Sequence, residues 1–405
     1  MGVISRIVRY AVAGTLLAGA FSQGWAQETI KNALTKGKIS LDMRYRFEGV
    51  DQDGFAEDAE AYTLRTRLGY KTGTYHGFFA FAELEDVRAT GGEKYNSTSN
   101  GKTQFPVVAD PEDTEVNRGY LAYTGLKETT FKLGRHRITL DNLRFVGNVG
   151  WRQNEQTYDA FSAESVIAKK VNFFYAHINN ANQVFGDHHP DPSLANLNLS
   201  ADLINVSFNL GPGTLVAYTY LMETEDTPSS SHRNVGARYD GEHAFSDQVA
   251  LLYTGEFADQ SDYKDGAASV DAEYFLARVG LRLAPVTFSL GYELLGGDGV
   301  YAFTTPLATL HAMNGWADKF LVTPLNGLED IHLSVGATLA GFKLLAVYHD
   351  FGADEGGGSY GSELDLLVSR KVKDIFTFAV KYATYDADSF ATDTDKVWAL
   401  AQLEF

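Results

Sequence analysis

The sequence has no cysteine, only 9 prolines and fewer basic than acidic residues. Without cysteine there can be no disulfide framework, no thiolate metal site and no cysteine nucleophile. The 34 Lys and Arg residues stand against 52 Asp and Glu, and the resulting net charge of -18 argues against a nucleic-acid partner. Aromatic residues and leucine are too plentiful for a disordered chain. The length of 405 residues, taken alone, would suggest two or three soluble domains.

Long apolar runs are also missing after the N-terminus. Two arginines are the only charges before Glu28, and the apolar run 11–21 that follows them is too short to span a bilayer. Small residues within 24–26 suit signal-peptide cleavage, so we expect a secretory signal peptide over residues 1–26, with an N-terminal anchor as the alternative. No later segment approaches 18 consecutive apolar residues, so a membrane-spanning form would have to be a closed β-barrel.

The rest of the chain is built from segments in which apolar and polar residues alternate. In 38–49 the apolar face carries aromatic residues, and the polar face carries charges such as Arg44 and Arg46 at its middle. The same alternation recurs in 60–71 and 375–385. A soluble sandwich also alternates, but charge at mid-strand opposite an aromatic face is typical of a barrel with lipid outside and water inside.

The connections between these segments alternate in length, long then short. We therefore predict an all-β fold, a transmembrane antiparallel barrel of 18 strands over residues 38–405, with both termini periplasmic and a short periplasmic segment at 27–37. The strands are expected near 38–49, 60–71, 75–86, 114–124, 129–140, 156–164, 168–178, 201–210, 214–223, 232–241, 248–258, 271–283, 286–295, 328–337, 342–351, 360–371, 375–385 and 395–405.

A barrel of this size encloses water unless loops plug it, so inward-facing charges become the candidate site. The candidate pore-lining residues that would select anions are Arg44, Arg46, Arg65, Arg67, Arg118, Arg135, Arg152, Arg238, Arg278 and Arg282. The acidic residues assigned to an opposite wall are Asp42, Glu293, Asp330, Glu363 and Asp365. The alternative is that the charges neutralise one another and only stiffen the barrel.

Two long connections mix glycine, amides, aromatics and charge. We expect the segment around Trp151 and Gln153, and the segment holding His311, Trp316 and Asp318, to fold inward and contact solute. Packing of these loops without ligand contact is the alternative.

Several motifs resemble the alginate-export family of outer-membrane porins. They are the runs 41–48 and 63–70, the segments 133–135 and 150–153, and the segment 305–320. The resemblance covers essentially the whole chain after the signal, and it implies an arginine-rich conduit formed by Arg44, Arg46, Arg65, Arg67, Arg135 and Arg152. A dedicated alginate exporter is expected to be longer, with more extensive loops and turns that act as gates, whereas most inner turns predicted here are short. The resemblance therefore supports the barrel more strongly than it supports alginate as the solute.

The predicted function is an outer-membrane porin, a passive water-filled channel with an arginine-rich constriction for anionic or sugar-like solutes. The alternative is a dedicated export conduit for an acidic polysaccharide such as alginate. Expected partners are outer-membrane lipid, lipopolysaccharide and the barrel-assembly machinery, which would recognise the C-terminal Phe405. We predict no enzymatic activity, because lone histidines such as His332 and His349 on a polar face are usually inert. We also predict no cofactor and no metal site. Two histidines and two aspartates within 187–191 could bind a divalent metal, but loop tips of this kind are usually only solvated.

Overall fold

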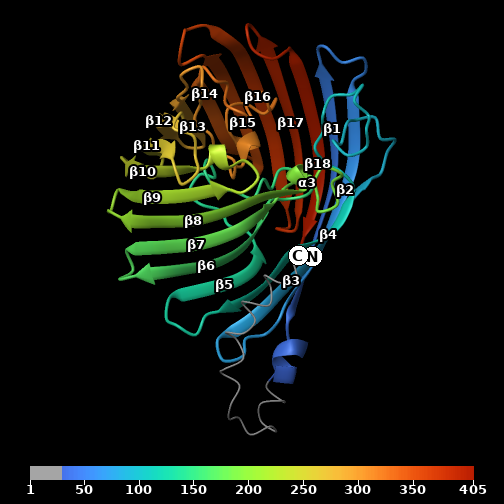
Figure 1. Ribbon diagram of the computed structural model, residues 1–405, viewed down its shortest axis with the longest axis vertical. Helices are drawn as coiled ribbons and strands as arrows, with labels where there is room; N and C mark the ends of the chain where they lie inside the picture. Colours follow the sequence, from blue (N-terminus) through green and yellow to red (C-terminus); the bar gives the residue numbers. More distant parts are fainter. Residues whose placement is uncertain (1–29) are drawn as a thin grey trace.

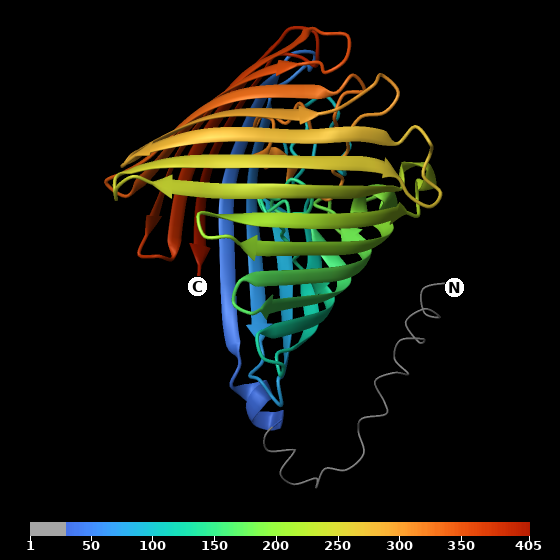
Figure 2. The same cartoon turned by 90° about the vertical axis from the view of Figure 1, so that its left-hand side faces the viewer.

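The computed structural model describes residues 30–405, and the predicted signal peptide at 1–26 lies outside the described residues. Within them, eighteen antiparallel strands form a single sheet. The sheet closes on itself because β1 pairs with β18 as well as with β2. The strands curve around a common interior (Figures 1 and 2). The 18-stranded all-β barrel predicted from the alternation is confirmed.

The strands are β1 Lys38–Gln52, β2 Ala59–Lys71, β3 Phe78–Ala89, β4 Asp113–Tyr123, β5 Thr129–His136, β6 Thr157–Ile167, β7 Val171–Asn182, β8 Asn196–Asn209, β9 Gly213–Thr224, β10 His232–Ala244, β11 Val249–Asp262, β12 Asp271–Leu283, β13 Val286–Leu295, β14 Leu328–Leu339, β15 Phe342–Gly352, β16 Ser359–Val372, β17 Phe376–Ala387 and β18 Thr394–Glu404. The helical pieces are short: residues 30–35, α3 Pro192–Ala195, η1 Pro228–Ser230 and η2 Leu310–Ala312. None of the helices within residues 30–405 has the length and apolarity needed to cross a membrane.

Some strand boundaries differ from the prediction for identifiable reasons. β3 begins at Phe78 rather than at residue 75, because Phe78 and Tyr75 exchange backbone hydrogen bonds within the turn. β5 ends at His136 rather than at residue 140, because the chain leaves the sheet there and enters the barrel interior. β8 begins five residues earlier than the predicted 201, at Asn196.

The two ends of the barrel differ. At one end, called here the short-turn end, strands are joined by tight turns such as 284–285 and 340–341. The other end, called the long-loop end, carries the loops 90–112, 137–156 and 296–327. The start of β1 and the end of β18 both lie at the short-turn end, where the Leu41 and Phe405 backbones exchange hydrogen bonds.

The two faces of the sheet carry opposite kinds of side chain. On β2, Leu68 is 52% exposed on the outer face, while its neighbour Arg67 is 4% exposed and points inward. On β17, Val380 is 53% exposed and the adjacent Lys381 is buried. An apolar outside and a charged inside are the reverse of a soluble protein and are typical of outer-membrane barrels.

The interior is filled in part by the three long loops. Phe145 of loop 137–156 packs against Tyr218 and Tyr274 of the wall and against Phe303 of loop 296–327. Aromatic residues of these loops and of the lumen wall therefore form an internal core.

Candidate functional site in the barrel lumen

The predicted arginine cluster lies on β1 and β2. Arg44 is the direct register partner of Arg65, and Arg46 and Arg67 follow on the same face toward opposite ends of the barrel. All four side chains are buried, and Arg46 has no exposed surface. The four guanidinium groups thus gather on one patch of wall as predicted, but they face protein groups rather than open lumen.

Carboxylates neutralise three of these arginines. The ion pairs are Arg46 with Asp110 of loop 90–112, Arg67 with Glu85 of β3, and Arg65 with Asp42 of β1, the last with 2.6 Å between Nη2 and Oδ2. Asp42 was assigned to an opposite acidic wall, and this assignment is wrong, because Asp42 is on β1 as the register partner of Arg67. Buried ion pairs of this kind fix the positions of the groups that they join.

Arg44 is held instead by loop 137–156. Its Nε donates to Oε1 of Gln153 at 2.9 Å, its Nη1 donates to the Gly150 carbonyl at 2.9 Å, and its Nη2 donates to the Arg152 carbonyl. Gln153 also donates from Nε2 to Oγ1 of Thr63 at 2.8 Å. The loop therefore folds inward, as predicted, and attaches to the basic wall through main-chain and amide groups.

The same loop crosses the lumen to the other wall. Arg152 lies 3.1 Å from Glu48 of β1 and 2.9 Å from Asp318 of loop 296–327. Arg144 forms a bidentate pair with Glu293 of β13, with a shortest distance of 2.5 Å. Bidentate Arg–carboxylate contacts are strong and directional. Loop 137–156 is thus fixed at both of its sides.

The acidic wall holds loop 296–327. Its carboxylates accept hydrogen bonds from that loop: Asp330 from Asn314 Nδ2 at 3.0 Å, Glu363 from the Ala317 N–H at 2.7 Å, and Asp365 from the Trp316 N–H at 3.2 Å. Glu293, Asp330, Glu363 and Asp365 are all buried. The predicted basic patch on β1 and β2 and the acidic patch on β13, β14 and β16 are therefore both present, and each is covered by a loop.

A lysine that sequence reasoning missed lies between the loops. Nζ of Lys381 is 4.0 Å from the ring centre of Trp151, 3.7 Å from that of Trp316 and 5.1 Å from that of Trp398. It also lies 2.7 Å from Nε2 of His311. We call these five residues the tryptophan cage. Since two of the rings come from different loops, Lys381 joins both loops to β17.

His311 connects the cage to a carboxylate. Its ring stacks on Trp151 with 4.9 Å between centres, and its Nδ1 lies 2.7 Å from Oδ1 of Asp318. Burial lowers the pKa of His311 to about 3, with Asp318 acting in the opposite direction. The imidazole is therefore neutral near pH 7, so it donates to Asp318 and accepts from Lys381. Asp318 also pairs with Lys396 at 2.9 Å.

Three further predicted arginines face the lumen as members of ion pairs. They are Arg118 with Glu83, at a shortest distance of 2.6 Å, Arg238 with Glu256 at 2.7 Å, and Arg282 with Glu242.

Arg135 does not line the lumen, contrary to the prediction. On β5 it shares the outward face of Leu133, which is 62% exposed, and it pairs across the strands with Asp159 at 3.0 Å. A second carboxylate, Asp187, lies 2.9 Å away. The inward position beside it belongs to His136, which is buried. The motif 133–135 thus contributes to the outer rim.

Open space remains toward the short-turn end. A cavity of about 430 Å³ is lined by residues of β9 to β13, including Asp240, Thr254, Arg278 and Ser289. Arg278 is exposed there, and among the interactions within residues 30–405 it has one hydrogen bond, from Nη2 to Oγ1 of Thr254 at 3.3 Å, and no ion pair. We call this space the vestibule.

The sequence predicts which strand residues face the lumen better than it predicts which residues they pair with. Lys381 stands on the polar face of a predicted strand, so its inward direction was predictable. Asp110 lies in a loop without periodicity, and no pattern singles it out as the partner of Arg46.

Known proteins with similar folds and sequences place the barrel in context. Solved structures that match include OccK9 (OpdG) of Pseudomonas aeruginosa, with 15% identity, a TM-score of 0.71, and 92% of this chain and 100% of that chain covered. OccAB4 of Acinetobacter baumannii matches with 14% identity and a TM-score of 0.70, covering 92% of this chain and 99% of that one. OpdK of Pseudomonas aeruginosa, solved with vanillate, matches with 14% identity and a TM-score of 0.70, covering 92% of this chain and 99% of that one. At these identities the likeness establishes the fold, which is that of outer-membrane porins.

The sequence comparisons cover less of the chain than the structural ones. Among curated proteins, none matches the sequence. The family model stops before the motif at 305–320, which the predicted resemblance had included. That model, described as alginate export, matches residues 36–298, more than half of the chain, and the protein belongs to this family, as its motifs predicted.

Proposed function

We propose that this protein is an outer-membrane channel for small anionic or sugar-like solutes. The apolar outer face suits the hydrocarbon of a bilayer, and the fold is that of outer-membrane porins. We further propose that residues 27–37 and the short-turn end face the periplasm after removal of a signal peptide at 1–26. The proposed activity is passive transport, without enzymatic chemistry.

The observation that carries anion selection is the unpaired Arg278. The arginines on β1 and β2 are neutralised by carboxylates or covered by loops, so they act mainly to fix the loops. Two carboxylates also line the vestibule, but Asp240 pairs with Arg238 and Glu242 pairs with Arg282. Arg278 forms no ion pair within residues 30–405, so its charge is available to a solute. A small carboxylate is the kind of solute that this geometry suits, and the structural neighbour OpdK was solved with vanillate.

A second candidate is export of an acidic polysaccharide, which the description of the family favours. A polymer would need a continuous path past the loops, which are fixed to the walls by contacts such as Arg144 with Glu293 and Ala317 with Glu363. Export would therefore require loops 137–156 and 296–327 to leave the lumen.

Planar-bilayer recording of the purified protein tests the proposal. We expect an anion-selective reversal potential in a salt gradient, and Arg278→Glu is expected to shift it toward cations. Arg370→Glu is the matched control, because Arg370 is exposed on the outer face of β16. Absence of conductance, also after deletion of the loops, would refute the channel. Block by uronic-acid oligomers, but not by small carboxylates, would favour polysaccharide export instead.

A further inference from the structure

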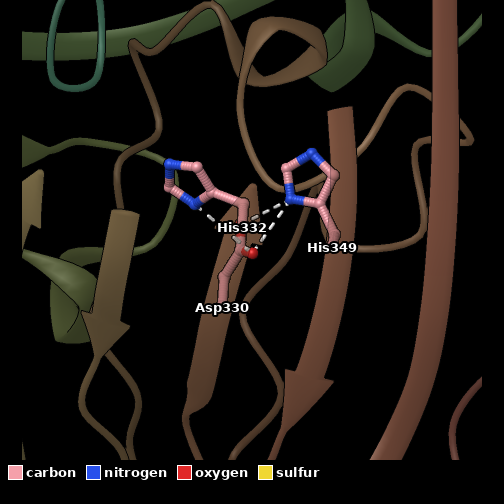
Figure 3. Close-up of side chains that lie close together, drawn as sticks. All are labelled: Asp330, His332 and His349. Carbon is pink, nitrogen blue, oxygen red and sulfur yellow. Dashed lines mark hydrogen bonds and ion pairs between the residues drawn. The ribbon is translucent and has the colours of Figure 1, made fainter. Parts of the chain in front are cut away.

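Three potential metal ligands converge on the lumen face of β14 and β15. Asp330 and His332 are two residues apart on β14, so their side chains share a face. His349 of β15 is the direct register partner of His332. Figure 3 shows the two imidazoles on either side of the carboxylate.

The three side chains are close enough to share one ion. Nδ1 of His349 lies within hydrogen-bond distance of both Asp330 oxygens, 2.9 Å from Oδ1 and 3.0 Å from Oδ2, and Nδ1 of His332 lies 3.6 Å from Oδ1. One ligand atom from each of the three residues can be chosen so that all lie within 4.8 Å of one another. A tetrahedral zinc ion with bonds of about 2.0–2.2 Å holds its ligands about 3.3–3.6 Å apart. A bound ion would replace the hydrogen bond between His349 and Asp330 and would separate those two atoms by a few tenths of an ångström.

The surroundings orient the three side chains. Asn314 donates to Oδ2 of Asp330 at 3.0 Å, and Oδ1 lies near both imidazoles. Oδ2 of Asp365 lies 3.7 Å from Nε2 of His349, and a carboxylate on that side favours Nδ1 as the metal-binding nitrogen. A carboxylate behind a ligating imidazole recurs in metal sites.

His332 shows that the cluster is unsatisfied without a ligand. Its Nδ1 is buried and has no hydrogen-bond partner among the described residues. Its register partner is Gly291, where a Cβ atom would lie 2.1 Å from Nε2 of the ring. The glycine therefore leaves room for an imidazole that, among residues 30–405, makes no protein hydrogen bond through Nδ1. Buried polar atoms without a partner are uncommon and often mark a missing ion or water.

We propose that Asp330, His332 and His349 bind a divalent transition-metal ion of the zinc class. Two imidazoles and one carboxylate suit Zn²⁺ or Co²⁺ and do not suit Ca²⁺ or Mg²⁺, which prefer all-oxygen ligands. Three protein ligands leave a fourth position for water or an incoming solute. The sequence predicts no metal site here. His332 and His349 stand on neighbouring predicted strands, and the register of β14 and β15 shows that they lie opposite each other beside Asp330.

Co²⁺ titration of the full chain tests the site. The protein is purified in detergent without a polyhistidine tag and stripped of metal, and Co²⁺ binding is followed by its visible absorption, with displacement by Zn²⁺. We expect saturable binding that His332→Gln and His349→Gln each abolish. His177→Gln is the control, because His177 forms a pair with Asp202 at 3.0 Å on the outer face. It is expected to leave the absorption unchanged.

Absence of saturable absorption, or equal absorption in the His332→Gln/His349→Gln double variant, would overturn the proposal. A second measurement needs no variant: modification of histidines by diethyl pyrocarbonate in the wild-type protein, mapped by mass spectrometry. Zn²⁺ is expected to protect His332 and not His177. Equal modification of His332 with and without Zn²⁺ would also overturn the proposal.

Discussion

Lys381 provides the sharpest test of how the loops are held in the lumen. Replacement by Met keeps the length of the side chain and removes its charge. A desolvated cation over an aromatic ring contributes about 2 kcal/mol, and two rings of the tryptophan cage lie within 4.0 Å of Nζ. Removing the charge also removes its desolvation cost, which opposes this gain. We expect a net loss of about 2–3 kcal/mol for the closed loops, on the order of a 30- to 140-fold shift toward the open state.

The assay follows from the distribution of tryptophan. The sequence has 4 Trp, and Trp25 falls in the predicted signal peptide. The other three belong to the tryptophan cage, so fluorescence of the mature barrel reports on the cage alone. Lys381→Met is expected to increase quenching by acrylamide and to lengthen open dwell times in single-channel recordings.

Two controls bracket this result. Lys381→Arg keeps the cation and is expected to preserve most of the closure. Lys132→Met removes a lysine over Tyr120, 5.8 Å from its ring centre and outside the cage, and is expected to leave quenching unchanged. If Lys381→Met leaves quenching and dwell times unaltered, or closes the loops further, the cation does not hold them.

Further predictions concern pH, stability and assembly. The pKa of His311 is lowered to about 3 in the folded protein, so between about pH 6.5 and 3 the imidazole is protonated in the unfolded chain and neutral in the folded one. Closure of the loops should therefore weaken as pH falls through this range, by at most about 1.4 kcal/mol per pH unit. His311→Gln should flatten the dependence of tryptophan quenching on pH, and an unaltered profile would contradict a neutral, buried His311. Asp110→Ala removes the nearer of two carboxylates from the buried Arg46 and leaves Glu48 at 3.3 Å, so we expect it to cost about 1–3 kcal/mol in urea unfolding. Glu60→Ala, which breaks an exposed pair, should cost less than about 1 kcal/mol. Equal costs would argue against a buried charge pair. Deletion of Phe405 is expected to reduce the heat-modifiable, assembled fraction in cells, and normal assembly would exclude recognition through this residue.

The sequence predicts the barrel well because strand alternation is a local property. Leu68 and Arg67 are adjacent in the chain and point to opposite faces of the sheet, so the alternation of apolar and charged residues indicates which face is turned to lipid. The gathering of Arg44, Arg46, Arg65 and Arg67 was predictable for the same reason, since adjacent strands were expected to pair.

The partners were not predictable, because loops have no period. Nothing in the sequence pairs Asp110 with Arg46 or places Trp316 over Lys381. The error at Arg135 has a local origin: Arg135 is predicted to face the lumen because it is charged, although Leu133, two residues earlier on the same face of β5, faces outward. The cluster of His332 and His349 needed the register of β14 and β15, which sequence alone does not define.

The pairing of β1 with β18 has a consequence for how the barrel forms. Asp42 and Glu404 are register partners from the first and the last strand, so this seam cannot form until β18 is in place. Until then, both outer strands present unpaired N–H and C=O groups, a template for aggregation and, in lipid, an unsatisfied edge. Contacts this distant in sequence form slowly. The vulnerable period of this protein is therefore the interval before closure, and a chaperone that shields the edges of β1 and β18 would protect the whole barrel.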